Sequence, residues 1–298
     1  MLERGSKADA EFSRKKWEVC RTFEALIKRD GLLSPDVDVA AGINGEVAQY
    51  IEDIESGRDV ERPGWLLEPT PGVFTFPLFS KAFCERLVAL LDAFEKTDLP
   101  RRRPNTMNNY GLILNEIGLG PFSHSLLDRV VAPLSRKLFE RETFATSLDH
   151  THTFTVEYEV GKDTGLDMHH DASEVTLNVC LGKDFRGGGL RFCGSFGSAD
   201  YRKNRLTVAH ERGRAVLHLG RVRHAAADVE GGERVNLIVW ARSSAFRAAA
   251  AYGHIKPDGY PKEKEGEVDL ICLSKANDAD YEERIRGGPR VKKARLDK

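Results

Sequence analysis

The 298-residue chain has no uninterrupted apolar run that approaches the ~18 residues of a membrane span. It has neither a Cys-x-x-Cys pair nor an Asn-x-Ser/Thr glycosylation acceptor, and its five cysteines are scattered and odd in number. These absences disfavour a membrane protein, a zinc knuckle and a disulfide framework. No apolar run follows Met1, so we expect no secretory signal and predict a location in the cytoplasm or the nucleus.

The chain also lacks an excess of either charge. It has 45 Lys and Arg residues against 46 Asp and Glu residues, for a formal net charge of −1. This balance argues against a protein that mainly coats nucleic acid. The exception is the basic C-terminal end, where a solvated tail is favoured over a nuclear signal or a nucleic-acid contact. Hydrophobic residues make up 41% of the chain and charged residues 31%, which is typical of a folded domain.

Residues 1–99 have the apolar spacing of helices. Asn44 and Ser80 are residue types that cap helix N-termini, and apolar residues follow each at intervals of three and four. The apolar positions are Phe12, Val19, Phe23, Leu26 and Ile27 in a first stripe, Val47, Ile51 and Ile54 in a second, and Phe83, Leu87, Leu90, Leu91 and Phe94 in a third. Residues 63–71 predict a linker or an extended crossing. A further helix is predicted over residues 123–139, kinked or restarted by Pro133.

Beyond His150 the pattern changes to alternation of apolar and polar residues, which is typical of half-buried strands. Strands are predicted over residues 153–160, 175–181, 190–192, 215–219 and 235–240, with a turn at the triple glycine of residues 187–189. Short strands with glycine turns favour a sandwich or jelly roll over a parallel sheet. The sequence therefore predicts an α+β protein. It has a helical region over residues 1–99, a domain over 100–250 with its β core at about 150–245, and a charged extension over 251–298.

The sequence His169-His170-Asp171 carries the clearest chemical signal. On an extended backbone, residues i and i+2 point the same way, so His169 and Asp171 share a face. A third ligand must come from elsewhere, and His224 is the candidate. Two histidines and one carboxylate form the facial triad of non-haem Fe(II) oxygenases, and zinc is the competing metal on ligand type alone.

Arg234 lies ten residues after His224, and residues 228–233 are predicted to turn the chain between them. Arg234 would then begin a buried strand, where its guanidinium needs an anionic partner. The planar fork of arginine suits a carboxylate held through two hydrogen bonds. A dicarboxylate that chelates the metal at one end and binds Arg234 at the other fits this pattern.

The triad together with Arg234 resembles the 2-oxoglutarate, Fe(II)-dependent dioxygenases. Residues 169–173, with Thr176, Asn178 and the triple glycine, resemble the catalytic domain of procollagen lysyl hydroxylases. Residues 103–110, 174–182 and 232–240 resemble the branch named 2-oxoglutarate and iron-dependent oxygenase domain-containing protein 2. The resemblance covers the stretch from about residue 100 to residue 245 and leaves out the helical start and the tail.

The resemblance implies a double-stranded β-helix, a form of jelly roll, with the helical N-terminal part packed on it. It implies that His169, Asp171 and His224 hold Fe(II), and that Arg234 forms a salt bridge with the distal carboxylate of 2-oxoglutarate. Tyr158 and Asn178 match positions that lie near the cosubstrate. The implied activity is hydroxylation with Fe(II), 2-oxoglutarate and O2, with ascorbate as reductant, and the expected substrate is a lysyl or prolyl side chain of a protein or peptide.

Other functions and roles stay open at this point. The protein is alternatively a non-catalytic metal-binding scaffold, or a nucleic-acid demethylase of the same superfamily, although Arg242 does not match the spacing of the second arginine in those enzymes. The simpler interpretations are an ordinary buried salt bridge for Arg234, core packing for Tyr158 and a solvent-exposed position for Asn178. Residues 108–110 border a substrate groove or form a plain turn. His218 stands where many relatives have an apolar residue and has no assigned role, and His150, His152, His210 and His254 are read as structural or exposed.

Overall fold

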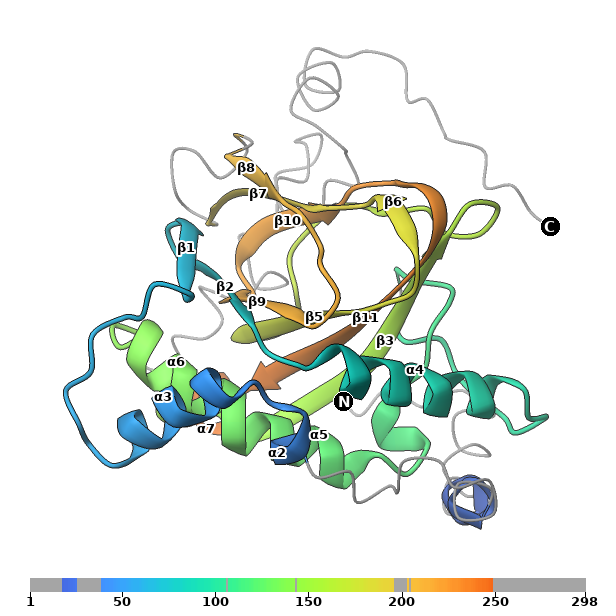
Figure 1. Cartoon of the computed structure of the whole chain (residues 1–298), viewed down its shortest axis with the longest axis horizontal. Coiled ribbons are helices and arrows are strands. Elements are labelled where there is room, and N and C mark those ends of the chain that lie inside the picture. The colour runs from blue at the N-terminus through green and yellow to red at the C-terminus, as the bar shows by residue number, and fades with distance from the viewer. Residues whose placement is uncertain are drawn as a thin grey trace.

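The computed structural model describes residues 18–25, 39–105, 107–142, 144–195, 203 and 205–248. Two antiparallel β-sheets form its centre, and helices gather along one side of the larger sheet (Figure 1). The predicted C-terminal extension and basic tail, His254, and the first-stripe residues Phe12, Leu26 and Ile27 lie outside the described residues. Among the helices that are described, none is long and apolar enough to cross a bilayer.

The helical elements are α2 (Val39–Gly42), α3 (Gly45–Glu55), α4 (Lys81–Glu95), η1 (Leu114–Glu116), α5 (Gly120–Leu126), η2 (Leu127–Val131), α6 (Ala132–Leu138) and α7 (Ser244–Ala248). The strands are β1 (Leu67–Thr70), β2 (Val73–Pro77), β3 (His150–Glu159), β4 (Leu166–His169), β5 (Val175–Gly182), β6 (Phe185–Gly187), β7 (Leu190–Ser195), β8 (Leu206–Val208), β9 (Arg214–Leu219), β10 (Val222–Ala226) and β11 (Val229–Arg242).

The larger sheet has the strand order β1-β2-β9-β5-β11-β3, with β6 paired to β11, and the smaller sheet has the order β4-β10-β7-β8. From β3 onward the chain crosses repeatedly between the two sheets: β3, β5, β6, β9 and β11 belong to the larger one and β4, β7, β8 and β10 to the smaller one. This arrangement is the double-stranded β-helix, a form of jelly roll, that the resemblance implies. Side chains on the facing sides of the two sheets enclose the interior in which the predicted site residues lie.

The predicted helix starts are confirmed. Asn44 caps α3 by accepting a hydrogen bond from the backbone N of Glu46 at 3.0 Å, and Ser80 caps α4 by accepting one from Phe83 at 3.2 Å. The whole apolar stripe of α4 is buried and belongs to the main core. The helix predicted over residues 123–139 is divided into α5, the π-helical η2 and α6, and Pro133 lies in the first turn of α6, where proline is tolerated.

The prediction of a helical region followed by a linker missed β1 and β2. β2 is almost wholly buried and pairs with β9, and β1 forms the edge of the larger sheet. Pro69 lies within β1, which is tolerated only because an edge strand has backbone N–H groups that need no ladder partner. The proposed boundary near residue 99 stays a prediction, and residues 67–77 contribute to the same sheet as the later strands.

The turn predicted over residues 228–233 is wrong. β10 ends at Ala226 and β11 begins at Val229, and both run antiparallel to residues 185–195 in one continuous direction. The chain therefore does not turn back here, and the glycine pair lies inside β11, opposite β6. Gly232 has a φ of +76°, and a Cβ there would lie 2.0 Å from the carbonyl oxygen of Asp184. The pair therefore permits a bend and a close approach within a strand, a use of glycine that sequence alone does not separate from a turn.

Candidate metal and cosubstrate site

The two histidines of the predicted triad come from neighbouring strands of the smaller sheet. His169 ends β4 and is the register partner of His224 on β10, and the two ring centroids lie 4.3 Å apart. Asp171 follows β4 and is held by a hydrogen bond from its backbone N to the carbonyl of Gly220 at 3.0 Å. Its carboxylate oxygens lie 3.5 Å from Nε2 of each histidine. The three ligand atoms all lie within 4.8 Å of one another, which is the spacing of a metal site.

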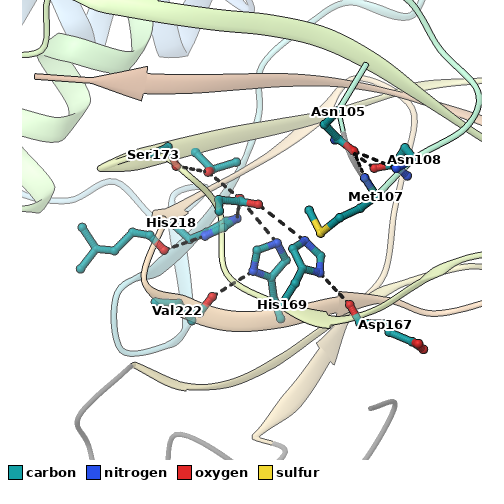
Figure 2. Close-up of polar contacts among 12 residues, drawn as sticks. Asn105, Met107, Asn108, Asp167, His169, Ser173, His218 and Val222 are labelled. Carbon is teal, nitrogen blue, oxygen red and sulfur yellow. Dashed lines mark hydrogen bonds and ion pairs between the residues drawn. The ribbon is translucent and has the colours of Figure 1, made fainter. Parts of the chain in front are cut away.

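Backbone carbonyls determine which ring nitrogen of each histidine faces the site. Nδ1 of His169 lies 2.7 Å from the carbonyl oxygen of Asp167, and Nδ1 of His224 lies 2.9 Å from that of Val222 (Figure 2). Because a carbonyl only accepts, each Nδ1 carries the proton and donates it. Each Nε2 therefore presents a lone pair toward Asp171, as a metal ligand requires.

The carboxylate of Asp171 is also held in place. The hydroxyl of Thr176 donates to Oδ2 at 2.6 Å, and Oγ of Ser173 lies 2.8 Å from that hydroxyl. Burial by itself raises the pKa of Asp171, but the adjacent His224 and His169 outweigh it and the pKa lies below its ordinary value. Burial lowers the pKa of His224 well below its ordinary value. The site thus offers one carboxylate and two imidazole nitrogens, and this donor set fits Fe(II) or Zn(II).

His218, to which the sequence assigned no role, lies directly behind this carboxylate. It is fully buried on β9, and its Nε2 lies 3.9 Å from Oδ2 of Asp171 without a hydrogen-bond partner among the described residues. Its ring centroid is 4.6 Å from that of His224, and its Nδ1 contacts the carbonyl of Leu219 at 2.9 Å. Burial lowers the pKa of His218, so a third neutral imidazole adjoins the triad.

Arg234 is fully buried on β11, beside its register partner Tyr158. Its Cζ lies 4.7 Å from the centre of the Tyr158 ring, and its Nε and Nη1 have no hydrogen-bond partner in the part of the chain that is described. Burial lowers the pKa of Arg234, yet a guanidinium stays charged at neutral pH. A buried cation without an anion is costly, so these atoms fit an anionic ligand. A Cβ at Gly188 would lie 2.5 Å from Nη1, so the triple glycine makes room for this side chain.

One cavity brings all six predicted site residues together, namely His169, Asp171, His224, Arg234, Tyr158 and Asn178. The hydroxyl of Tyr158 accepts a hydrogen bond from Nδ2 of Asn108 at 3.0 Å, and burial raises the pKa of Tyr158 to about 12. Oδ1 of Asn178 accepts a hydrogen bond from Nδ2 of Asn236 at 2.6 Å. Tyr158 and Asn178 therefore line the cavity and do not face the helices or solvent.

Several lining residues were not assigned from the sequence. Asn236, Ile238 and Trp240 follow Arg234 at every second position of β11, so the period of a strand would have placed them on the face of Arg234. Asn105, Met107 and Asn108 also line the cavity, and Oδ1 of Asn105 accepts hydrogen bonds from the backbone N atoms of the other two, each at 2.8 Å (Figure 2).

His210, which the sequence analysis interpreted as structural or exposed, lies beside the side-chain amide of Asn236. Its Nε2 is 3.3 Å from Nδ2 of Asn236, and burial together with the charge of Arg234 lowers its pKa well below the ordinary value. No local spacing connects His210 with Arg234, so only the folded arrangement reveals the contact.

Comparison with known proteins supports the resemblance. Residues 46–143 match the model of the OGFOD2-like domain, which extends the likeness into the helical part that the motif resemblance left out. The 2-oxoglutarate and iron-dependent oxygenase domain-containing protein ICU11 of Arabidopsis thaliana is 42% identical over 63% of this chain and 49% of its own length. The human 2-oxoglutarate and iron-dependent oxygenase domain-containing protein 2 is 38% identical over 68% of this chain and 61% of its own length.

A more distant likeness is to mouse procollagen-lysine,2-oxoglutarate 5-dioxygenase 1, which is 31% identical over 54% of this chain and 22% of that protein. The chain thus spans about half to three fifths of the oxygenase domain-containing relatives and a smaller part of the procollagen enzyme. By its sequence and by the domain model that it matches, the chain is a relative of the 2-oxoglutarate and iron-dependent oxygenase domain-containing proteins, as the motif resemblance predicted.

Proposed function

We propose that the chain is an Fe(II)- and 2-oxoglutarate-dependent hydroxylase. One observation carries the proposal: a single cavity holds a two-histidine, one-carboxylate cluster together with the buried guanidinium of Arg234, whose Nε and Nη1 have no hydrogen-bond partner among the described residues. Metal type is not decided by the cluster, since zinc accepts the same ligands. A cation buried in the same cavity favours a dicarboxylate that reaches from the metal to Arg234, and the names of the relatives point to 2-oxoglutarate and iron.

In this proposal His169 and His224 bind the metal through Nε2 and Asp171 binds it through a carboxylate oxygen. Arg234 binds the distal carboxylate of the cosubstrate, with Tyr158 and Asn178 along its path. Fe(II), 2-oxoglutarate and O2, when bound, supply the chemistry that converts a C–H bond to C–OH, and ascorbate keeps the iron reduced. The protein orients these groups, maintains the ligand tautomers and excludes bulk water from the cavity.

The proposed substrate is a lysyl or prolyl side chain of a protein or peptide. Support comes from mouse procollagen-lysine,2-oxoglutarate 5-dioxygenase 1, whose name states a procollagen lysine as its substrate. A nucleic-acid demethylase is the less favoured activity, because Arg242 does not line the cavity and instead donates from Nε to the carbonyl of Ala172 at 2.7 Å. A non-catalytic scaffold is the remaining alternative.

Succinate formation tests these functions against one another. The full chain, supplied with Fe(II), 2-oxoglutarate and ascorbate, is incubated separately with a peptide library, free amino acids and oligonucleotides. We expect succinate release coupled to a gain of one oxygen atom on peptides, and we expect EDTA to abolish it. Coupled turnover confined to free amino acids or nucleosides contradicts a protein substrate, and salt-sensitive oligonucleotide binding with turnover supports the demethylase. Absence of turnover on every substrate favours the scaffold.

The cellular compartment, cytoplasm or nucleus, is proposed from the scattered cysteines and the absence of glycosylation acceptors. Imaging of the tagged chain in cells tests it.

A further inference from the structure

The cavity continues beyond the metal ligands, on the side away from Arg234. Arg234 and Trp240 both line it from β11, and six residues of extended strand separate their backbones by about 20 Å. Trp240 is the register partner of Thr176, whose hydroxyl bonds Asp171, so the Trp240 end adjoins the metal ligands. A cosubstrate that connects the metal to Arg234 leaves this end of the cavity for another molecule.

The Trp240 end has aromatic and aliphatic walls. The ring centroid of Phe154 lies 5.0 Å from that of Trp240, with the two planes at 86°, and Ile238 lines the same stretch. Asn105, Met107 and Asn108 form a third wall, and Figure 2 shows the Met107 thioether beside His169. Apolar walls beside the metal ligands suit a compact aliphatic group whose C–H bond is presented to the reacting centre.

One polar atom in this wall has no partner. Nε1 of Trp240 is buried and makes no hydrogen bond to any described residue, although the side chain lines the cavity and is only 7% exposed. A buried indole N–H ordinarily finds an acceptor, since leaving it without one is costly. A ligand that brings a carbonyl oxygen to Nε1 removes this cost, and the main-chain carbonyl of a polypeptide is such a group.

The charges around this end disfavour a lysyl ammonium. Asp171 is the only carboxylate among the described residues that line the cavity, and it already accepts from Thr176 and is the proposed anionic metal ligand. The guanidinium of Arg242 lies 5.7 Å from the centre of the Trp240 ring, so a cation already occupies a position on this aromatic group. An ammonium at this end would be desolvated without a carboxylate partner.

We propose that Trp240, Phe154 and Met107 form the substrate subsite and that it accepts an uncharged, compact aliphatic side chain of a polypeptide, foremost a prolyl residue. The indole N–H of Trp240 bonds a main-chain carbonyl of that polypeptide. This inference rests on the proposed function and narrows its choice between lysine and proline. Proline suits the subsite because its ring is rigid and neutral and its nitrogen carries no hydrogen that would need an acceptor. In the reaction one C–H of the ring becomes C–OH, with one atom of O2 entering the product and the other entering succinate as 2-oxoglutarate loses CO2.

Binding of matched peptides tests the subsite without turnover. The full chain is loaded with Mn(II) and N-oxalylglycine in place of Fe(II) and 2-oxoglutarate. Labelled peptides in several flanking sequences carry Pro, Lys, Nε-trimethyl-Lys or Ala at the central position, and fluorescence anisotropy gives their affinities. We expect prolyl peptides to bind at least about tenfold more tightly than lysyl peptides, the difference that burial of an unpaired charge imposes.

Variants of Trp240 separate its N–H from its aromatic surface. Trp240→Phe keeps a ring and removes the donor, and we expect it to weaken prolyl-peptide binding roughly fivefold, the effect of one hydrogen bond. Trp240→Ala removes both and should weaken binding more than about tenfold. The affinities for Mn(II) and N-oxalylglycine should stay unchanged. The matched control is Trp65→Phe, because Trp65 packs against Tyr50 with ring centroids 5.7 Å apart and does not line the cavity.

Tighter binding of lysyl or trimethyl-lysyl peptides than of prolyl peptides would overturn the proposal, as would unchanged prolyl-peptide affinity in Trp240→Phe. If no peptide binds although Mn(II) and N-oxalylglycine do, both the subsite and the protein substrate are refuted. If the wild type fails to bind Mn(II) or N-oxalylglycine, the proposed function itself fails. The peptide affinities thus test the subsite, whereas the affinities for Mn(II) and N-oxalylglycine test the proposed function.

Discussion

Over residues 234–241 both faces of strand β11 are buried, but the two faces differ in chemistry. The face toward the helices consists of Val235, Leu237, Val239 and Ala241, all of which belong to the main hydrophobic core. The face toward the cavity consists of Arg234, Asn236, Ile238 and Trp240. Side-chain alternation in a strand assigns the two sets to opposite sides of the sheet.

The two faces also differ in their buried polar atoms that have no hydrogen-bond partner among the described residues. Nε and Nη1 of Arg234, Oδ1 of Asn236 and Nε1 of Trp240 are buried without hydrogen-bond partners among the described residues, and all of them lie on the cavity face. Protein interiors rarely leave such atoms unsatisfied. We infer that the helix face provides stability, while the cavity face is arranged for ligands. Substitutions on the two faces should therefore affect different measurements.

The largest expected effect is that of Asp171→Ala, which removes the only anionic ligand of the triad. Turnover should be abolished, and Mn(II) affinity should fall by more than the roughly 10–100-fold that loss of an outer hydrogen-bond partner causes. Asp167→Ala is the matched control, since Asp167 contributes its backbone carbonyl to His169 and its side chain points away in Figure 2. Calorimetric metal titration checks both variants, and unchanged Mn(II) binding in Asp171→Ala would refute the triad.

Arg234→Ala should weaken 2-oxoglutarate binding by about 3–5 kcal/mol, because it leaves a buried carboxylate without its partner. Metal affinity should change little, since Arg234 is not a ligand. Arg234→Lys should recover only part of the loss, because an ammonium does not reproduce the planar fork. Isothermal titration with the metal present measures each affinity. Equal cosubstrate affinity in Arg234→Ala and the wild type would show that the distal carboxylate binds elsewhere.

Leu237→Ala and Ile238→Ala compare the two faces directly at adjacent positions. Leu237 is fully buried against the core, so its truncation should lower the free energy of unfolding by about 2–5 kcal/mol. Ile238 borders a cavity that already exists, so its truncation should cost less than about 2 kcal/mol and should change ligand affinity instead. Denaturant unfolding and titration with the labelled prolyl peptide on both variants test this. A larger loss of stability in Ile238→Ala would remove the distinction.

The smallest effect concerns Glu157, which is buried on β3 next to Tyr158 but on the opposite face. Burial, with Glu95 and Glu233 nearby, raises the pKa of Glu157 from 4.5 to about 7. The unfolded chain therefore loses this proton near pH 4.5 and the folded chain only near pH 7, so folding is penalised as pH rises through this window. Above pH 7 the penalty reaches about 3 kcal/mol, which corresponds to the difference between the two pKa values.

Glu157→Gln should accordingly raise the free energy of unfolding at pH 8 by up to about 3 kcal/mol and have almost no effect near pH 4. Unfolding in urea at both pH values measures the difference. A stabilisation of equal size at the two values would mean that protonation of Glu157 is not its cause.

Much of this molecule is determined by local sequence. Asn44 and Ser80 start their helices because a side-chain oxygen satisfies nearby backbone N–H groups, which depends on only three or four residues. The alternation in β3 and β5 identifies strands for the same reason, since the side-chain period is a property of the extended backbone. The six site residues were predicted from residue type and resemblance, and all six line one cavity.

Tertiary structure decided the rest, because pairing between distant strands leaves no local mark. The register of β4 with β10 places His169 opposite His224, and the register of β5 with β9 places His218 opposite Thr176, beside Asp171. β1 contains a proline and was missed, since only its position at the edge of the sheet makes that residue acceptable. Residue chemistry thus identifies the side chains that are able to bind a metal and an anion. Which of their polar atoms have hydrogen-bond partners, and which have none, is decided only when the two sheets enclose these side chains.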